Sequence, residues 1–180
     1  MHSNRAVFLD RDGTLNADPG YISNPDQITD LLPGAIEGLK KFKQQGFLLV
    51  VVSNQSGVGR GLIKPETLPL VNAKINQILA PQGIQIDRFE MCTHKPDENC
   101  ICRKPHPGLI HSAAKALSID VSQSVMIGDR LTDLECGINA GCKTIILIRS
   151  GDGKKTEANL INEFKVDFVV DDLVEAAKHT

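Results

Sequence analysis

The chain has 180 residues, of which 41% are hydrophobic and 23% are charged, and its formal net charge is -2. A chain of this length can bury a core of its own, and that charge gives no electrostatic reason to expect nucleic acid or an anionic membrane as a partner. The first apolar run, Ala6 to Leu9, is too short for a signal peptide, and no segment approaches the length of a membrane span. We therefore expect residues 1–180 to form one cytoplasmic domain and the protein to be a monomer.

Short apolar runs alternate with helical patterns along the chain. Because the apolar runs are continuous and do not alternate with polar residues, both faces of each strand should be covered, which is typical of a parallel sheet with helical crossovers. The sequence thus predicts a three-layer, Rossmann-like α/β fold. Strands are predicted at residues 6–9, 47–52, 89–92, 124–127, 144–148 and 167–170. Helices are predicted near residues 35–42, 68–79, 109–117, 133–140, 157–164 and 173–178.

Two aspartates, Asp10 and Asp12, directly follow the first predicted strand, at the edge of a parallel sheet where ligands bind. A calcium loop is one alternative, but the stretch RDGTLN lacks the third oxygen ligand and the later glutamate of such a loop. Phosphoryl transfer fits better, because one carboxylate can attack phosphorus while the other handles the proton of the leaving oxygen. Asp129, after the fourth strand, would complete an oxygen-ligand site for Mg²⁺ that offsets the repulsion between carboxylate and phosphate.

Four short motifs carry a resemblance to a known group of enzymes. With DRDGT at 10–14, SNQ at 53–55, RKP at 103–105 and GDRLTD at 128–133, the chain resembles the haloacid dehalogenase superfamily of phosphohydrolases. The resemblance implies that Asp10 is the nucleophile, which forms an aspartyl-phosphate, and that Asp12 is the general acid and then the base. The implied ligands of the phosphoryl oxygens are Ser53 and Lys104, and those of Mg²⁺ are Asp10, the carbonyl of Asp12, and Asp129. The role of Asp133 stays open.

Only one helix and one strand fit between Asp10 and Ser53, which leaves no room for a large cap domain. We therefore expect an open cleft in which loops 17–23 and 55–61 recognise the substrate. The second loop, QSGVGRG, lacks the spacing of a dinucleotide fingerprint, so a nucleotide cofactor is not expected. Its Arg60 either approaches a substrate phosphate or belongs to a simple glycine-rich turn.

A second cluster of polar residues follows the third predicted strand, in the pattern C-x-H-x5-C-x-C formed by Cys92, His94, Cys100 and Cys102. Four protein ligands leave no open position for water, so this pattern predicts a structural Zn²⁺ site. The alternative is a set of unrelated buried thiols and a surface histidine. Because Lys104 follows the last ligand closely, the zinc loop would fix the backbone that directs Lys104 toward the phosphate. Two further thiols, at 136 and 142, are interpreted as small buried hydrophobic residues.

Within the superfamily, the zinc loop together with GYIS, SNQSGVGRG and CICRKPHPGL is most similar to the D-glycero-D-manno-heptose 1,7-bisphosphate phosphatases. This similarity implies removal of the C7 phosphate from a sugar bisphosphate, on the route to nucleotide-activated heptose for lipopolysaccharide or S-layer glycan. Histidinol-phosphate phosphatase shares the zinc loop and is the alternative enzyme. A phospho-accepting receiver domain is a distant alternative, since it has no use for Asp12 or zinc. The residues implied to face the substrate are Asp18, Gly20, Tyr21, Ser53, Asn54, Gln55, Ser56, Arg103 and Arg130, and Arg60 is a further candidate.

Overall fold

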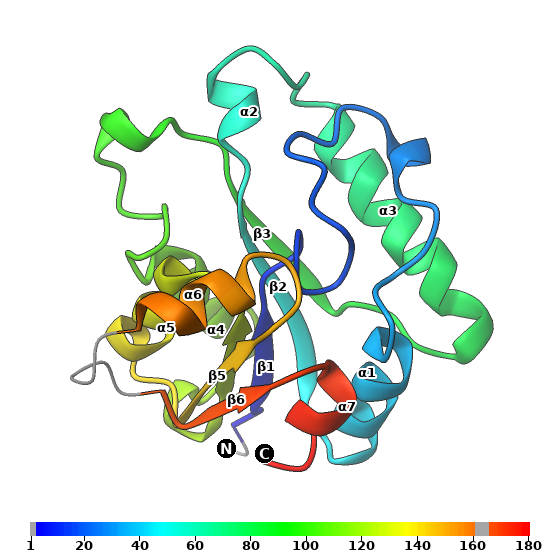
Figure 1. Cartoon of the computed structure of the whole chain (residues 1–180), viewed down its shortest axis with the longest axis vertical. Helices are drawn as coiled ribbons and strands as arrows, with labels where there is room; N and C mark the ends of the chain where they lie inside the picture. The colour runs from blue at the N-terminus through cyan, green and yellow to red at the C-terminus, as the bar shows by residue number, and fades with distance from the viewer. Residues whose placement is uncertain (1–2, 161–165) are drawn as a thin grey trace.

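The computed structural model describes residues 3–160 and 166–180. Its strands form one parallel sheet in the order β3-β2-β1-β4-β5-β6 (Figure 1). The strands are β1 (Ala6–Leu9), β2 (Leu48–Asn54), β3 (Arg88–Cys92), β4 (Val125–Gly128), β5 (Thr144–Ile148) and β6 (Phe168–Val170). The predicted α/β fold is confirmed, and each strand lies within two residues of its predicted bounds.

Helices cover both faces of the sheet, because successive strand residues point to opposite sides. In β1, Val7 and Leu9 belong to one buried cluster, and Ala6 and Phe8 belong to the other. The first cluster is completed by α1 (Ala35–Gln44), α3 (Thr67–Leu79) and α7 (Leu173–Ala176). The second is completed by α4 (Gly108–Leu117) and α5 (Leu131–Ala140), and α6 (Gly153–Asn159) lies on the same side in Figure 1.

Three helical segments differ from the sequence prediction. The helix expected at 157–164 is α6, which begins at Gly153, and residues 161–164 of that prediction lie outside the described residues. Its first residues are glycine and lysines, so no apolar periodicity marks its start. The last helix, α7, ends at Ala176, two residues before the predicted end, and a short helix, α2 (Ser56–Gly59), forms in the glycine-rich loop. Single 3-10 turns lie at Pro25–Gln27, Ala80–Gln82, Pro96–Glu98 and Val121–Gln123.

The chain order of the strands places a crevice beside β1. From β1 the chain moves outward through β2 and β3, then returns to the other side of β1 with β4. Ligands of such sheets bind at this reversal, beyond the carboxyl ends of the strands. All residues from Asp10 to Ser53 are described, and they contain one 3-10 turn, α1 and most of β2, so no large cap domain is inserted there. Among the described residues, no helix has the length and apolar character needed to cross a membrane.

Candidate active site

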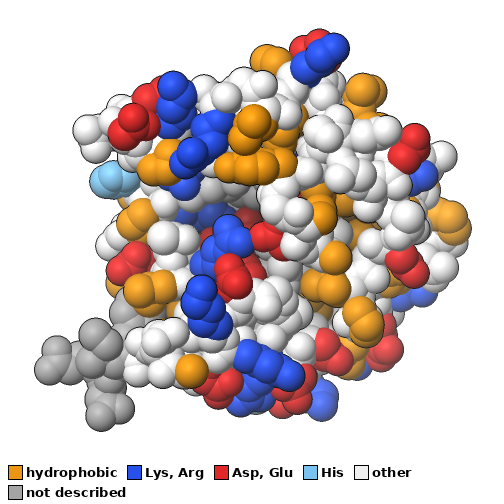
Figure 2. All heavy atoms as spheres, turned by 45° about the horizontal axis from the view of Figure 1, so that its top comes forward, with side chains coloured by type: hydrophobic (Ala, Val, Ile, Leu, Met, Phe, Trp, Pro, Cys, Tyr) orange, Lys and Arg blue, Asp and Glu red, His pale blue; other side chains and the backbone are white. Residues whose placement is uncertain are grey.

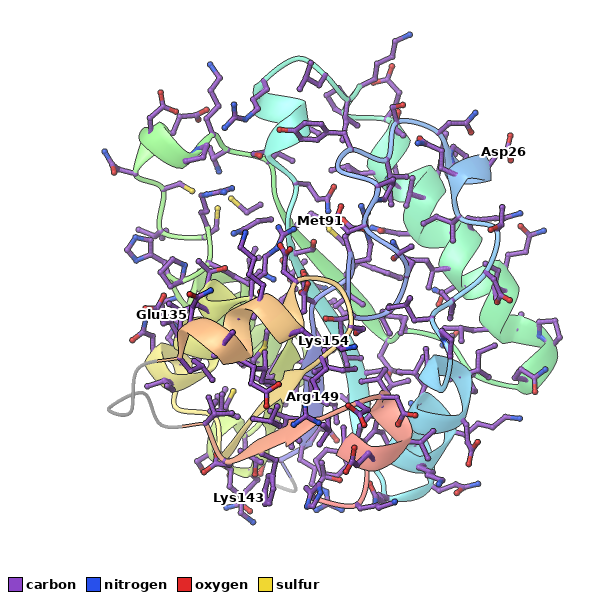
Figure 3. All side chains as sticks on the ribbon, viewed as in Figure 1. Asp26, Met91, Glu135, Lys143, Arg149 and Lys154 are labelled. Carbon is purple, nitrogen blue, oxygen red and sulfur yellow. The ribbon has the colours of Figure 1, made fainter. Side chains whose placement is uncertain are left out.

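A cleft of about 460 Å³ opens at the carboxyl ends of the strands. In Figure 2 acidic and basic side chains gather around this hollow. In Figure 3, Met91 lies in the carboxyl half of β3, toward the end of the sheet at which the cleft opens, whereas Lys143, just before β5, lies toward the amino ends of the strands. The predicted residues that line the cleft are Asp10, Asp12, Asp18, Gly20, Tyr21, Ser53, Asn54, Gln55, Ser56, Arg103, Lys104 and Arg130. Arg60 is not among the lining residues, whereas Thr132 and Asp133, to which we assigned no contact with the substrate, are.

Three buried carboxylates meet beneath the cleft, from Asp10, Asp129 and Asp133, each of which has an oxygen within 4.8 Å of the others. Burial raises the pKa of Asp10 to about 6, and the charges of Asp133 and Asp12 add to this rise. Burial, together with repulsion from Asp10 and Asp133, raises the pKa of Asp129 to about 7. The buried Oδ1 of Asp129 has no hydrogen-bond partner. Crowded carboxylates with an unpartnered oxygen fit a site for a hard divalent cation such as Mg²⁺.

Lys104 supplies a positive charge within this cluster. Its Nζ lies 2.8 Å from Asp10 Oδ1 and 2.6 Å from Asp133 Oδ1, and it donates to the carbonyl oxygen of Val52 at 2.7 Å. These three acceptors use all the protons of the ammonium group. Asn54 fixes the backbone of Lys104 from the other side, because its Oδ1 accepts the Lys104 N–H and its Nδ2 donates to the Lys104 carbonyl. Asn54 therefore orients Lys104, a contact that the sequence did not reveal.

Asp12 is turned away from the three carboxylates and toward Arg11. The Arg11 guanidinium donates to both oxygens of Asp12 at 2.9 Å, Asn16 donates to Oδ1, and Gln55 donates to Oδ2 at 2.7 Å. Burial alone would raise the pKa of Asp12, but the Arg11 charge and these hydrogen bonds outweigh burial and hold the pKa below its ordinary value. Gln55 also donates to the Oγ of Ser53 at 3.0 Å. The predicted acid and one predicted phosphoryl ligand are thus linked through one amide.

A segment that sequence reasoning missed, residues 150–156, encloses Asp129. The backbone N–H of Asp152 donates to Asp129 Oδ2 at 2.8 Å, and Thr156 Oγ1 donates to the Asp129 carbonyl at 2.7 Å. Gly151 has a φ of +54°, and a Cβ there would collide with the Asp129 carboxylate. The sequence did contain a signal, since SGDG follows a predicted strand at the same edge of the sheet.

Arg130 spans the mouth of the cleft. Its Nη2 lies 2.6 Å from Asp18 Oδ2, and its Nε lies 3.0 Å from Asp152 Oδ2. Asp18 belongs to the predicted recognition loop 17–23, and Asp152 belongs to the segment after β5. Arg130 therefore joins the two sides of the opening, as well as lining it.

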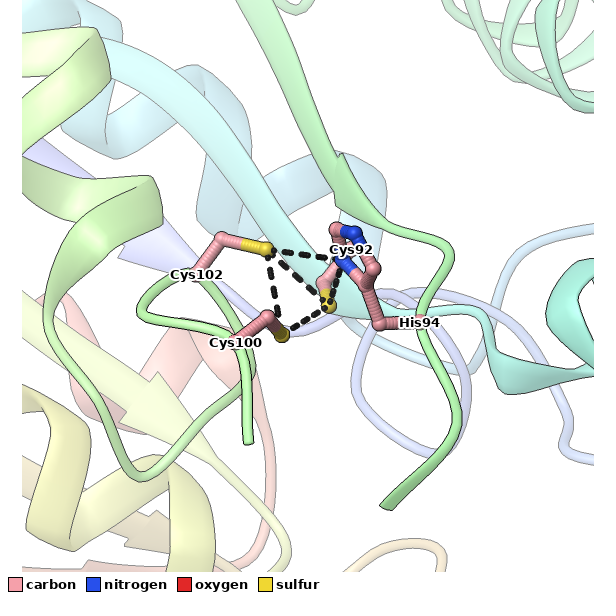
Figure 4. Close-up of side chains that lie close together, drawn as sticks. All are labelled: Cys92, His94, Cys100 and Cys102. Carbon is pink, nitrogen blue, oxygen red and sulfur yellow. Dashed lines mark hydrogen bonds between the residues drawn. The ribbon is translucent and has the colours of Figure 1, made fainter. Parts of the chain in front are cut away.

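The predicted cysteine and histidine ligands lie together at the end of β3 (Figure 4). The Sγ atoms of Cys92, Cys100 and Cys102 are 3.2 to 3.6 Å apart, and His94 Nδ1 lies 3.3 Å from the Sγ of Cys102. Tetrahedral Zn²⁺ with bonds of about 2.3 Å to sulfur requires sulfur atoms roughly 3.8 Å apart, so this donor set fits zinc. Arg103 Nη1 contacts the His94 carbonyl at 3.5 Å, which connects the cluster to the wall of the cleft.

Comparison with known proteins finds relatives along nearly the whole chain. A family model described as HAD-hydrolase-like matches residues 101–176. D-glycero-beta-D-manno-heptose-1,7-bisphosphate 7-phosphatase of Haemophilus influenzae is 38% identical over 174 residues, which cover 93% of this chain and 94% of that protein. The enzyme of the same name from Escherichia coli K12 is 36% identical over 177 residues, which cover 94% of this chain and 90% of that protein.

A solved structure extends the similarity to three dimensions. D,D-heptose 1.7-bisphosphate phosphatase from B. bronchiseptica, complexed with magnesium and phosphate, has a TM-score of 0.87 and 34% identity, with 97% of each chain covered. The fold and the site define a hydrolase of the haloacid dehalogenase class, and the protein is a phosphoric monoester hydrolase. Within that class, the chain belongs to the family of the D-glycero-beta-D-manno-heptose-1,7-bisphosphate 7-phosphatases.

Proposed function

We propose that this protein removes the C7 phosphate of D-glycero-β-D-manno-heptose 1,7-bisphosphate, on the route to nucleotide-activated heptose. The observation that carries the proposal is the buried Asp10, which lies 2.8 Å from Lys104 and shares one cluster with Asp129 and Asp133 at the floor of an open cleft. A carboxylate held in this way can attack phosphorus. The names of the relatives support the choice of sugar and of the β anomer.

The metal ions fit the donor atoms on the chain. Asp10, Asp129 and the main-chain carbonyl of Asp12 would hold Mg²⁺, beside Asp133, and the ion would offset the charge of the carboxylates and of the incoming phosphate dianion. Cys92, His94, Cys100 and Cys102 would hold Zn²⁺ as a structural ion.

The chain's own residues then divide the chemistry. Asp10 attacks phosphorus, the bond from phosphorus to the sugar oxygen breaks, and Asp12 gives that oxygen the proton that it took from water in the preceding turnover. Four hydrogen bonds favour the ionised form of Asp12, so one donor gives way while Asp12 carries the proton. In the second half of the reaction Asp12 takes a proton from water, which attacks the phosphoryl group on Asp10 and releases phosphate. Ser53 and Lys104 hold the phosphoryl oxygens. Because every proton of Lys104 already has an acceptor, a phosphoryl oxygen must replace or share one of them.

Recognition of the sugar falls to the loops around the opening. Asp18, Gly20, Tyr21, Ser56, Arg103 and Arg130 line the cleft, and two of them are cations suited to an anionic substrate. As part of the same proposal, residues 1–180 act as one phosphatase domain, as a monomer and in the cytoplasm.

Phosphate release tests the proposal. The wild type and Asp10→Asn would be incubated with Mg²⁺ and, separately, with the β and α anomers of the heptose bisphosphate and with histidinol phosphate. We expect the wild type to prefer the β anomer, with ³¹P NMR showing loss of the phosphate at C7, and Asp10→Asn to be inactive. Turnover of histidinol phosphate alone would favour the alternative enzyme. Turnover of none of the three would contradict the proposal.

A further inference from the structure

The carboxylate of Asp12 accepts hydrogen bonds from three side chains, although it lines an open cleft. Arg11 Nε and Nη2 donate to its two oxygens, Asn16 donates to Oδ1, and Gln55 donates to Oδ2, at 2.7 to 2.9 Å. An ionised carboxyl group has about four acceptor sites, so these donors fill the sites of the ionised form, and one of them gives way while Asp12 carries a proton. The bidentate contact with Arg11 fixes the plane of the carboxylate as well as its position.

Arg11 is unusual in its burial. It is 0% exposed, and among the described residues its one ion-pair partner is Asp12. The turn after β1 makes this contact possible, because the N–H groups of Leu15 and Asn16 both donate to the Arg11 carbonyl and curl the chain back over it. A buried guanidinium is unfavourable unless a carboxylate compensates its charge. Arg11 and Asp12 therefore form one rigid unit, of which Asp12 lines the cleft.

We propose that Arg11 is a positioning residue for the transfer of the proton by Asp12, and that Gln55 assists it. The inference rests on the proposed role of Asp12 as acid and base. Gln55 is 5% exposed and donates through one Nε2 to both Asp12 and Ser53. Gln55 therefore fixes the position of the Asp12 carboxylate relative to Ser53, which is proposed to hold the phosphoryl group. A displacement of about 1 Å at such a site is enough to slow catalysis by roughly 10²-fold.

Two substrates whose leaving groups differ in their need for a proton separate this positioning role from a merely structural one. The p-nitrophenolate ion leaves without protonation, whereas a sugar alkoxide needs the proton from Asp12. The ratio kcat/KM covers only the steps up to formation of the phosphoryl group on Asp10, so slow hydrolysis of that group does not affect it. A well-placed general acid contributes typically about 10²–10⁴-fold. Loss of positioning should therefore lower kcat/KM for the sugar phosphate and largely spare p-nitrophenyl phosphate.

The experiment compares Arg11→Met, Arg11→Lys, Gln55→Met and Asp12→Asn on p-nitrophenyl phosphate and on a sugar phosphate that the wild type hydrolyses. Arg88→Met is the matched control, since Arg88 pairs with Glu90 on β3 and does not line the cleft. We expect kcat/KM for the sugar phosphate to fall at least about 100-fold in Arg11→Met, less in Arg11→Lys and Gln55→Met, and not in Arg88→Met. For p-nitrophenyl phosphate the fall should stay below about tenfold in every variant.

Equal losses on both substrates, or no loss on either, in folded Arg11 variants would overturn the inference. If circular dichroism shows that Arg11→Met does not fold, Arg11→Lys and Gln55→Met decide by the same criterion. Asp12→Asn separates the role of Asp12 as acid from the positioning role of Arg11. If kcat/KM falls only for the sugar phosphate in Asp12→Asn, but not in the Arg11 variants, only the positioning role is refuted. If kcat/KM falls equally for both substrates in Asp12→Asn, Asp12 is not the general acid.

Discussion

Replacing Lys104 with methionine tests how the site holds its negative charge. Lys104 is 3% exposed and lies 2.8 Å from Asp10 and 2.6 Å from Asp133, so the variant leaves buried carboxylates without their cation. Removing one partner of a buried ion pair destabilises a protein by about 3–5 kcal/mol. For a chain of this size, each kcal/mol lowers Tm by about 2–4 °C, so we expect a fall of roughly 6–20 °C.

The fall in Tm should depend on pH and on Mg²⁺. The pKa of Asp10 is raised to about 6 and that of Asp129 to about 7, so the folded protein binds more protons at these residues than the unfolded chain. Their ionisation therefore destabilises the fold above these pKa values, and the penalty shrinks as the pH falls below them and vanishes near the unfolded-state pKa of about 3.9. Lys104→Met removes a positive charge that lowers the pKa of Asp10. Protons or Mg²⁺ must then balance the charge of the carboxylates. The difference in Tm between wild type and variant should therefore shrink at about pH 5.5 or with Mg²⁺.

Melting curves by circular dichroism at about pH 8 and about pH 5.5, with and without Mg²⁺, measure both effects. Lys43→Met is the matched control, because Lys43 lies 3.0 Å from Asp87 but its side chain is 35% exposed. Such pairs contribute at most about 1 kcal/mol, so the control should lose no more than about 4 °C. A fall in Tm in Lys104→Met that equals that of the control, or that is the same under all four conditions, would show that Lys104 does not balance the charge of the buried carboxylates.

Three other changes test the remaining parts of the site. Asp10→Asn should fold but release phosphate more than about 10⁴-fold slower, because it lacks the nucleophile, and near wild-type release would exclude this role. Removing Zn²⁺ with a strong chelator and restoring only Mg²⁺ should abolish most activity, since the loop before Lys104 loses its anchor; a verified zinc-free sample with full activity would contradict this. Gly151→Ala should weaken Mg²⁺ binding at least about tenfold in calorimetric titration, because its Cβ displaces Asp129. Gly46→Ala, also at positive φ but with open space around its Cβ, is the control and should bind Mg²⁺ normally.

The parts of the fold that the sequence predicted correctly are those with strong local patterns. Runs such as residues 145–148 are apolar at every position, and both faces of that strand are indeed buried. Asp10 and Asp129 were predicted to meet because the carboxyl ends of parallel strands share one edge of the sheet. The clustering of Cys92, His94, Cys100 and Cys102 was predicted because the C-x-H and C-x-C pairs are only a few residues apart.

The contacts that the sequence did not reveal depend on how distant segments pack together or on the course of a turn. Nothing in residues 150–156 indicates that the Thr156 hydroxyl reaches the backbone of Asp129 across the site. The pairing of Arg11 with its neighbour Asp12 depends on the curl of a turn, and periodicity does not describe turns. Arg60 was a candidate because arginines bind phosphate, but the short helix α2 places it outside the lining of the cleft.

Chemical trapping tests directly whether Asp10 becomes phosphorylated during turnover. The protein would be mixed with substrate and Mg²⁺, quenched during turnover, reduced with borohydride and digested for mass spectrometry. An acyl-phosphate on Asp10 is reduced to homoserine, so the account predicts homoserine at position 10 and nowhere else. Phosphate release at a normal rate with an unmodified Asp10, or with homoserine at another aspartate, would contradict it.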